Sequence, residues 1–395
     1  MRKVFITGIG VISALGETVT ENRIALMDGK CGIIKSTHLL TKYSGLLPFG
    51  EVSISTEELK EKLKIKDDGV TRTTLLAATA FNEALKDAQL SLSQLTSCDT
   101  ALVGATTVGG MCLTDELYRD ANQDFKNSPF LSSYDCASVF MYLQRKYQLN
   151  GIVNTINTAC SSSANVIMYG ARLIKNGLAK KAIVGGADSL SKFTINGFNA
   201  LHILSPEVCA PFDENRKGLN LGEGAAFLVL EREEDIGNKK VYAEVSGYCN
   251  TNDAFHTSSL SENGEGPYLA MKGALSSAQL KATEIDFINA HGTGTENNDE
   301  AESRAMIRLF DKQPAFASTK SNTGHTLGAS GAIEAVYSVL NLTFQEVYPG
   351  LHFKKAIANT CLEPVKSYKK CNLNHIMSNS FGFGGNCTSL IFSKS

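Results

Sequence analysis

One stretch of helical sequence occurs twice in the chain, about half the chain length apart. Residues 84–90 read Ala-Leu-Lys-Asp-Ala-Gln-Leu, and residues 274–280 read Ala-Leu-Ser-Ser-Ala-Gln-Leu. Each copy is soon followed by an aspartate, Asp99 or Asp286, and a short β-branched run. Two amphipathic helices can resemble each other by chance, but the shared order of helix, loop, aspartate and strand favours a duplicated α/β unit.

Short apolar runs alternate along the chain with segments of helical spacing. Continuous apolar strands between helices predict sheets that are covered on both faces, which is the α/β class. The expected strands are 4–10, 99–107, 152–157, 181–189, 225–231 and 286–294, and the expected helices are 71–90, 164–176, 268–280 and 329–345.

A charged segment at 231–240, which contains Gly237 and Asn238, divides the chain near its middle. We therefore expect two halves, residues 1–239 and residues 240–395. No linker rich in proline or serine separates them, so the halves should pack as one body.

The charge balance argues against a nucleic-acid partner, and the hydrophobic pattern argues against a membrane. Lysine and arginine number 38 against 40 aspartate and glutamate, a formal net charge of -2, whereas phosphate binding relies on clustered basic residues. No stretch approaches the roughly 18 apolar residues of a membrane span. The apolar start is interrupted by Thr7, Gly8, Gly10 and Ser13, which favours a buried strand over a secretory signal.

The ten cysteines are scattered, and no two of them form a C-x-x-C pair. Neither a zinc site nor a redox pair is expected, so we predict no metal. In so long a chain the thiols are typical of a cytoplasmic protein that keeps its cysteines reduced, mostly as small buried residues.

Cys160 is the first candidate for chemistry. It lies in the run Asn-Thr-Ala-Cys-Ser-Ser-Ser-Ala at 157–164, between an expected strand and an expected helix. The positive end of a helix dipole and unpaired backbone N–H groups stabilise a thiolate, the nucleophilic form. The junction also suits a nucleophile elbow, although small residues there can simply permit close packing.

Two histidines occupy strand exits that are rich in glycine and threonine. His291 ends an apolar strand and faces a turn that we expect to be flexible, and His325 precedes a small-residue helix, with Lys320 five residues upstream. A single histidine is more often structural than catalytic. Here two of the seven histidines lie in such strand exits, and the chain also has a candidate cysteine. This combination favours a functional role.

Glycines flank an aromatic residue near the C-terminus, Gly382 and Gly384 around Phe383. Glycine permits positive φ and lets backbone N–H groups approach a ligand. One interpretation is a tight turn beside the last strand, and the other is an oxyanion donor combined with a mobile aromatic gate. Gly8 and Gly10 lack the third glycine and the acidic residue of a dinucleotide-binding loop.

Four motifs in this order, at 158–164, 289–302, 318–335 and 379–385, resemble those of the β-ketoacyl-[acyl-carrier-protein] synthases, most closely the elongating synthase II type. The resemblance covers essentially the whole chain. It implies the thiolase-like fold, in which duplicated αβαβα halves form one five-layered body. The N-terminal half would carry the nucleophile and the C-terminal half both histidines.

Matched motif by motif, the resemblance also implies roles for individual residues. Cys160 takes the position of the nucleophile, and His291 and His325 take those of the two catalytic histidines. The remaining matches are the supporting residues Lys320, Asp299, Glu302 and Glu334, the oxyanion and gate residues Gly382, Phe383 and Gly384, and the acyl-pocket residues Val108 and Phe198.

The activity that the resemblance implies is a decarboxylative Claisen condensation. Malonyl-acyl-carrier-protein would react with a Cys-bound acyl group to give 3-oxoacyl-acyl-carrier-protein, in fatty acid elongation. No cofactor is implied beyond the phosphopantetheine of the acyl carrier protein, which is the implied partner. A homodimer is implied as well, with an interface at the sheet edge and loops of the 100–160 region, where residues 133–149 look hard to bury within one subunit.

Two departures from the family pattern bear on specificity. Ala210 stands where an arginine usually precedes Pro-Phe-Asp, and Asn386-Cys387 replaces a usual Thr-Asn. They keep open a specialised ketosynthase of a polyketide, polyene or resorcinol-type pathway. Cys160 with both histidines argues against a non-catalytic chain-length-factor subunit, and residues 322–325 do not fit a CoA-dependent thiolase. The motifs leave open the acyl length, the carrier protein and a heterodimer partner.

Overall fold

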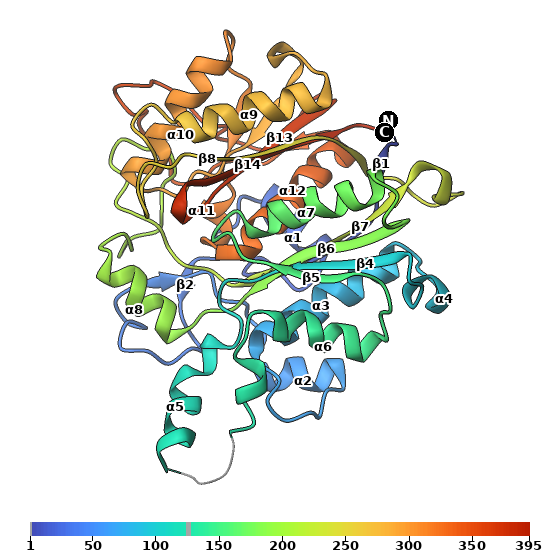
Figure 1. Ribbon diagram of the computed structural model, residues 1–395. Helices are drawn as coiled ribbons and strands as arrows, with labels where there is room; N and C mark the ends of the chain where they lie inside the picture. Colours follow the sequence, from blue (N-terminus) through green and yellow to red (C-terminus); the bar gives the residue numbers. More distant parts are fainter. Residues whose placement is uncertain (1, 124–127) are drawn as a thin grey trace.

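A ten-stranded mixed sheet runs through the computed structural model, which describes residues 2–123 and 128–395. The strand order is β10-β9-β13-β14-β8-β1-β7-β6-β4-β5 (Figure 1). The strands are β1 (Val4–Ser13), β4 (Thr100–Ala105), β5 (Val153–Ile156), β6 (Lys181–Asp188), β7 (Gly224–Arg232), β8 (Ala243–Asn252), β9 (Phe287–Asn289), β10 (Ala315–Ala317), β13 (His375–Phe381) and β14 (Asn386–Ser393).

The two halves of this sheet have the same topology. When the strands of the large sheet are counted along the chain within each half, they lie side by side in the order third, second, fourth, fifth and first. This order is β5-β4-β6-β7-β1 in the N-terminal half and β10-β9-β13-β14-β8 in the C-terminal half. In each, the first three strands of that order are parallel and the last two run antiparallel to their neighbours. The halves join where β1 pairs with β8 over Phe5 and Ile6. The duplicated α/β unit expected from the repeat is confirmed.

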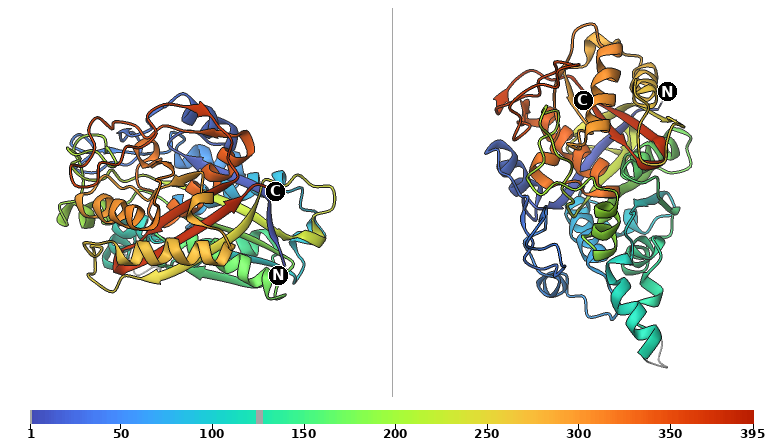
Figure 2. Two further views of the ribbon diagram at one scale, coloured as in Figure 1. Left: turned by 90° about the horizontal axis from the view of Figure 1, so that it is seen from above. Right: turned by 90° about the vertical axis from the view of Figure 1, so that its left-hand side faces the viewer.

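Helices and sheet form five layers. The helices α3 (Arg72–Asp87) and α6 (Ala137–Tyr147) cover one outer face, and α9 (Glu265–Ala278) and α10 (Glu296–Leu309) cover the other. The helices α7 (Ser162–Lys175) and α12 (Ser330–Phe344) lie between the two halves of the sheet (Figures 1 and 2). The repeated sequence falls at the ends of α3 and α9, which occupy equivalent outer positions.

The central layer is the most deeply buried part of the molecule. Every residue of α12 from Ser330 to Leu342 is buried, including the charged Glu334. Together with α7 it packs into one hydrophobic cluster that includes Leu228 of β7 and Leu390 of β14, one strand from each half. The two halves therefore share a core rather than touching through separate ones.

Shorter elements connect the layers. They are α1 (Val19–Met27), α2 (Thr56–Leu63), α4 (Leu92–Leu95), α5 (Thr114–Gln123), α8 (Lys192–Ala200), α11 (Lys320–Thr323) and the small sheets β2 (Ile34–Lys35) with β3 (Pro48–Phe49) and β11 (Glu346–Val347) with β12 (Lys369–Lys370). The helix α5 projects from the body in both figures. Within the described parts of the chain, no helix is long and apolar enough to cross a membrane.

Two sequence expectations are wrong. The strand expected at 286–294 ends at Asn289, because positive φ at Gly292 and Gly294 turns the chain. The expectation that residues 133–149 are hard to bury in one subunit is wrong for Val139 and Phe140 of α6, which are fully buried against the sheet, whereas Met141 is 41% exposed.

Candidate active site

Six of the residues singled out by sequence lie in the connections that follow the carboxyl ends of strands. Because parallel neighbours end at the same edge of a sheet, such loops gather side chains from distant parts of a chain. The loops contain Val108 after β4, Cys160 after β5, His291 after β9, Lys320 and His325 after β10, and Phe383 after β13.

Cys160 lies in a tight turn between β5 and α7. Ala159, just before it, has φ of 54°, an unusual value for a residue other than glycine. The turn is held by Thr158, whose N–H donates to Ser162 Oγ over 2.8 Å and whose carbonyl accepts from Ser161 Oγ over 2.8 Å. The side chain is buried. This is the strained strand-to-helix geometry expected of a nucleophile elbow.

The expected thiolate is not the resting form of Cys160. Burial raises the pKa of the thiol to about 11, and the positive charge of Lys320 and the backbone N–H groups of Phe383 and Cys160 act in the opposite direction. The sequence argument counted the helix terminus and left out burial, which disfavours any charged sulfur. The thiol is therefore protonated at neutral pH.

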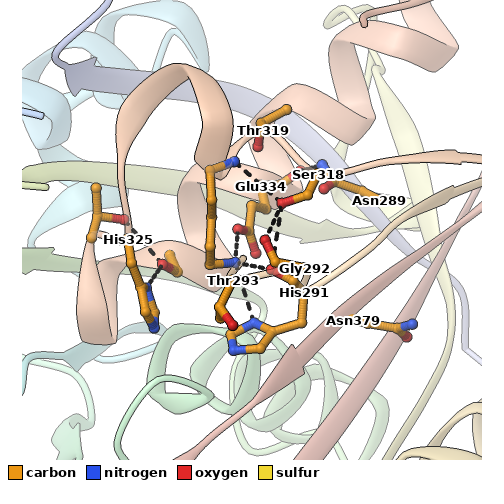
Figure 3. Close-up of polar contacts among 12 residues, drawn as sticks. Asn289, His291, Gly292, Thr293, Ser318, Thr319, His325, Glu334 and Asn379 are labelled. Atoms are coloured by element: carbon orange, nitrogen blue, oxygen red, sulfur yellow. Dashed lines mark hydrogen bonds and ion pairs between the residues drawn. The ribbon is translucent and has the colours of Figure 1, made fainter. Parts of the chain in front are cut away.

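Lys320 determines the proton position on His291. Its ammonium group donates to His291 Nδ1 over 3.2 Å, to the His291 carbonyl over 2.6 Å and to Glu334 Oε1 over 2.5 Å (Figure 3). An ammonium group has no acceptor, so Nδ1 must be unprotonated and Nε2 carries the hydrogen. Burial and the charge of Lys320 hold the pKa of His291 well below its usual value, which keeps the ring neutral.

His325 has the same tautomer by a different route. The N–H of Leu327 donates to His325 Nδ1 over 3.3 Å, and Ser330 Oγ lies 3.0 Å from the same atom. Burial and Lys320 again hold the pKa well below its usual value. The rings of His291 and His325 are 5.4 Å apart and nearly perpendicular, so the site has two neighbouring neutral imidazoles with a hydrogen on Nε2.

Two buried carboxylates tie down the turn that follows His291. Glu302 accepts the N–H groups of His291 and Gly292, each over 2.9 Å, and Asp299 accepts those of Thr293 and Gly294. The turn that we expected to be flexible is therefore held by hydrogen bonds to carboxylates of α10.

The two carboxyl groups nearest the histidines have raised pKa values. Burial raises the pKa of Glu302 to about 7 against the opposing hydrogen bonds, and burial raises that of Glu334 to about 7 against the charge of Lys320. Burial also raises the pKa of Asp299.

Cys160 lies where two cavities meet. One, of about 220 Å³, is lined by Cys160, both histidines and the Phe381–Phe383 segment. The other, of about 430 Å³, is largely apolar and is lined by Cys160 and by residues that include Val108, Phe198, Leu327 and Phe383. The rings of Phe198 and Phe383 stack at 5.7 Å between centroids, 16° from parallel, and both rings line the two cavities.

The glycine-rich loop joins β13 to β14, so it is the tight turn beside the last strand. It also lies against the Cys160 elbow: a Cβ at Gly382 would be 2.6 Å from the Thr158 carbonyl oxygen. Gly384 has φ of 82° and is exposed. The interpretation as a tight turn is confirmed, and the interpretation as an oxyanion donor and gate stays a prediction.

Asn386, one of the departures from the family pattern, connects this loop to the elbow. Its Oδ1 accepts from Ser161 Oγ over 2.8 Å, Asn165 Nδ2 over 2.9 Å and Asn250 Nδ2 over 2.7 Å. Cys387 is fully buried and packs in an apolar cluster with Phe381. The amide oxygen therefore links α7, β8 and the loop.

Several residues of the site were missed by sequence reasoning. Ser318 Oγ donates to the Gly292 carbonyl over 2.6 Å (Figure 3), Asn379 donates to Glu302 over 3.1 Å, and Ser330 contacts His325. Ser318 and Ser330 lie inside a recognised motif, so their position was a usable signal. Asp188 lies one residue before the end of the expected strand at 181–189 but carried no further signal.

Family models match nearly the whole chain. The model described as "Beta-ketoacyl synthase, N-terminal domain" matches residues 1–236, and the model described as "Beta-ketoacyl synthase, C-terminal domain" matches residues 242–354.

Curated relatives share about a third of their residues with this chain. A 3-oxoacyl-[acyl-carrier-protein] synthase 2 of Vibrio harveyi is 32% identical, over 100% of this chain and 99% of that protein. A 3-oxoacyl-[acyl-carrier-protein] synthase 2 of Staphylococcus aureus is 31% identical, over 100% and 98%. Among solved structures, the ishigamide ketosynthase/chain length factor has a TM-score of 0.92 at 29% identity and covers 100% of this chain and 99% of its own.

Proposed function

The chain belongs to the β-ketoacyl synthase family, and from that premise we propose that it condenses malonyl-acyl-carrier-protein with an acyl group on Cys160 in fatty acid elongation. The names of its curated relatives, 3-oxoacyl-[acyl-carrier-protein] synthase 2, support this substrate class. One observation carries the proposal: Cys160 lines a cavity with two neutral imidazoles, His291 and His325.

The first step is transfer of the acyl group to Cys160. The sulfur attacks the thioester carbonyl, a bond forms between Sγ and the acyl carbon, and the bond to the pantetheine sulfur breaks. The thiol proton ends on the departing pantetheine thiol. The N–H groups of Cys160 and Phe383 stabilise the developing oxyanion, and one such donor is typically worth about 3–4 kcal/mol in the barrier.

The second step is decarboxylation of the malonyl group. The bond to the carboxylate breaks, CO₂ leaves, and negative charge moves to the thioester oxygen of the enolate. Neutral imidazoles with hydrogen on Nε2 donate to that oxygen without a proton transfer, which is the form that Lys320 and Leu327 impose on His291 and His325. Decarboxylation itself supplies the carbanion, so the step needs no cofactor.

In the last step the enolate carbon attacks the acyl carbon on Cys160. A carbon–carbon bond forms, the bond to Sγ breaks, and the sulfur leaves as a thiolate. One proton from water restores the thiol, since its pKa of about 11 favours the protonated form. The product is 3-oxoacyl-acyl-carrier-protein.

The surrounding residues support these steps without exchanging protons with substrate. Lys320 and Glu334 hold the tautomer of His291, and Asp299 and Glu302 hold its turn. The apolar cavity at Val108 and Phe198 would receive the acyl chain. Phe383, which lies between the two cavities, would open or close the passage, with Gly382 and Gly384 as its hinges.

The acyl carrier protein is the proposed partner, and a homodimer the proposed assembly. Strand β5 ends the sheet, and an edge strand with unpaired backbone groups is a ready pairing surface. Pairing of β5 with its copy in a second chain would join the two sheets. Light scattering at micromolar concentration should report a dimer, and a monomer would reject this assembly.

We place the reaction in the cytoplasm, a reducing compartment where a catalytic thiol is kept free.

Cys160→Ala tests the chemistry. The variant should form no acyl adduct and no condensation product, while an exposed cysteine changed in the same way, Cys98→Ala, should keep both activities. Intact-protein mass spectra after incubation with acyl-carrier-protein measure the adduct. An adduct on the Ala variant would reject Cys160 as the nucleophile.

A further inference from the structure

Asp188 is a fully buried carboxylate that the proposed steps do not use. Its Oδ1 accepts from Thr106 Oγ1 over 2.5 Å, from the Thr107 N–H over 2.9 Å and from the Val108 N–H over 2.8 Å. Its Oδ2 accepts from Thr107 Oγ1 over 2.7 Å and from the Gly328 N–H over 2.7 Å. One side chain therefore collects five donors from two distant segments.

The donor set favours the charged form of this carboxylate. Backbone N–H groups cannot accept a hydrogen bond, so a protonated carboxyl group would lose partners that the carboxylate keeps. Burial raises the pKa of Asp188 above its usual value, and the hydrogen bonds from Thr106, Val108 and Thr107 oppose this rise.

The two segments belong to different halves of the chain and to different parts of the site. Thr107 and Val108 line the apolar cavity beside Cys160. Gly328 follows Leu327, whose side chain lines the same cavity and whose N–H orients His325. Two consecutive N–H groups of one turn thus serve His325 and Asp188.

The close approach of the chain to Asp188 and Thr107 requires glycine at position 328. A Cβ at Gly328 would lie 2.9 Å from Asp188 Oδ2 and 3.0 Å from Thr107 Cγ2. The turn is therefore fitted to the carboxylate with no space between them.

We propose that Asp188 is a positioning residue that sets acyl-chain selectivity, because it holds the cavity wall at Val108 against the turn that orients His325. The inference rests on the proposed function, since it assumes that the acyl chain on Cys160 enters the apolar cavity. A shift of the Asp188 side chain would therefore move the cavity wall at Val108 and the ring of His325 together.

The charge of Asp188 gives a second, independent readout. Among the titratable groups near Cys160, Lys320 lowers the pKa of the thiol and Asp188 raises it, and His291 and His325 are neutral. Removal of the carboxylate charge should therefore make the thiol more acidic.

Asp188→Asn tests both readouts. An amide of the same shape accepts at one end only, so the link to Val108 or to Gly328 is lost. The ratio of kcat/KM for long and short acyl-carrier substrates should change about tenfold, and the pH midpoint for iodoacetamide alkylation of Cys160 should fall. Glu346→Gln is the matched control: this buried carboxylate accepts from Arg23 and Lys370, away from both cavities.

A second variant separates the effect of the contact between Gly328 and Asp188 from the effect of the Asp188 charge. Gly328→Ala displaces the turn and keeps the carboxylate, so it should change the selectivity ratio and leave the alkylation midpoint in place. An unchanged ratio in a folded Gly328→Ala or Asp188→Asn protein overturns the proposal, and so does an equal change in the Glu346→Gln control. A wild-type protein that forms no acyl-enzyme would instead reject the proposed function.

Discussion

The two halves of the molecule place different chemistry at equivalent positions of one scaffold. In both, the loops after the second, third and fourth strands reach the site. In the N-terminal half these loops carry 106–108 and Cys160, and Asp188 is the last residue of β6. In the C-terminal half they carry His291, the run 320–325 and the loop at 382–385.

The halves also differ in how these loops are supported. In the nucleophile half Asp188 accepts N–H groups of the 106–108 loop and Glu223 accepts that of Leu190, whereas the histidine half uses Asp299, Glu302 and the pair of Lys320 with Glu334. Both halves thus hold their loops with buried carboxylates, but a cation against an imidazole occurs in the histidine half, where Lys320 fixes the proton position on His291.

The largest effect is expected when the histidine half alone is disabled. His291→Ala and His325→Ala should each keep acylation of Cys160, which uses the other half, and lose condensation about a hundredfold to a thousandfold, the typical loss for one oxyanion donor. Acyl transfer and CO₂ release are measured separately, with His375→Ala on β13 as control. Loss of acylation with intact CO₂ release in both variants would reverse the assignment of the halves.

A smaller effect is expected when the charge of Lys320, which lies in the C-terminal half and acts on Cys160 in the N-terminal half, is removed. Lys320 favours the charged forms of Cys160 and Glu334, so Lys320→Met should raise the pKa of both groups. Alkylation of Cys160 should slow at every pH below the thiol pKa, about tenfold for each unit of the rise.

The measurement for Lys320 is the alkylation rate across the neutral and alkaline range. Lys181→Met removes another buried lysine, which pairs with Glu231 away from the cavities, and should leave the profile unchanged. A faster reaction in Lys320→Met would mean that the lysine does not act on the sulfur through its charge.

The smallest effect is expected at the contact between elbow and gate. Asn386→Thr with Cys387→Asn restores the usual family pair but removes an amide oxygen that holds Ser161 and Asn165. One net hydrogen bond changes the open population of the loop severalfold. The kcat/KM across short, medium and long acyl substrates should change more than uncoupled CO₂ release.

Cys387→Ala is the control for this contact, because it leaves the Asn386 hydrogen bonds in place and should keep wild-type selectivity. Equal changes in selectivity and CO₂ release in the double variant would show that the loop departure is neutral.

Much of the fold was predictable because the relevant signals are local. The repeat at 84–90 and 274–280 identified two equivalent helices, and β-branched runs identified the strands. The strand at 286–294 was overextended because its last N–H groups are taken by Asp299 and Glu302. Carboxylates several residues further along a helix leave no trace in hydrophobic periodicity.

The site residues that belong to sequence motifs were predictable. The properties that depend on packing between distant parts of the chain were not. Cys160, His291, His325 and Phe383 line the same cavity. The raised pKa of Cys160 depends on burial that no local pattern reports. The hydrogen bond from Ser161 to Asn386 spans 225 residues, so neither sequence neighbourhood indicates it.

The shared central layer has an evolutionary consequence. In a single ancestral copy, the face of α7 that now packs on α12 would have been an exposed apolar surface, which favours association. Association of two such copies would cover this surface, as the joining of both halves in one chain does now. The helix α5 extends from the body at the periphery, away from this layer (Figure 1).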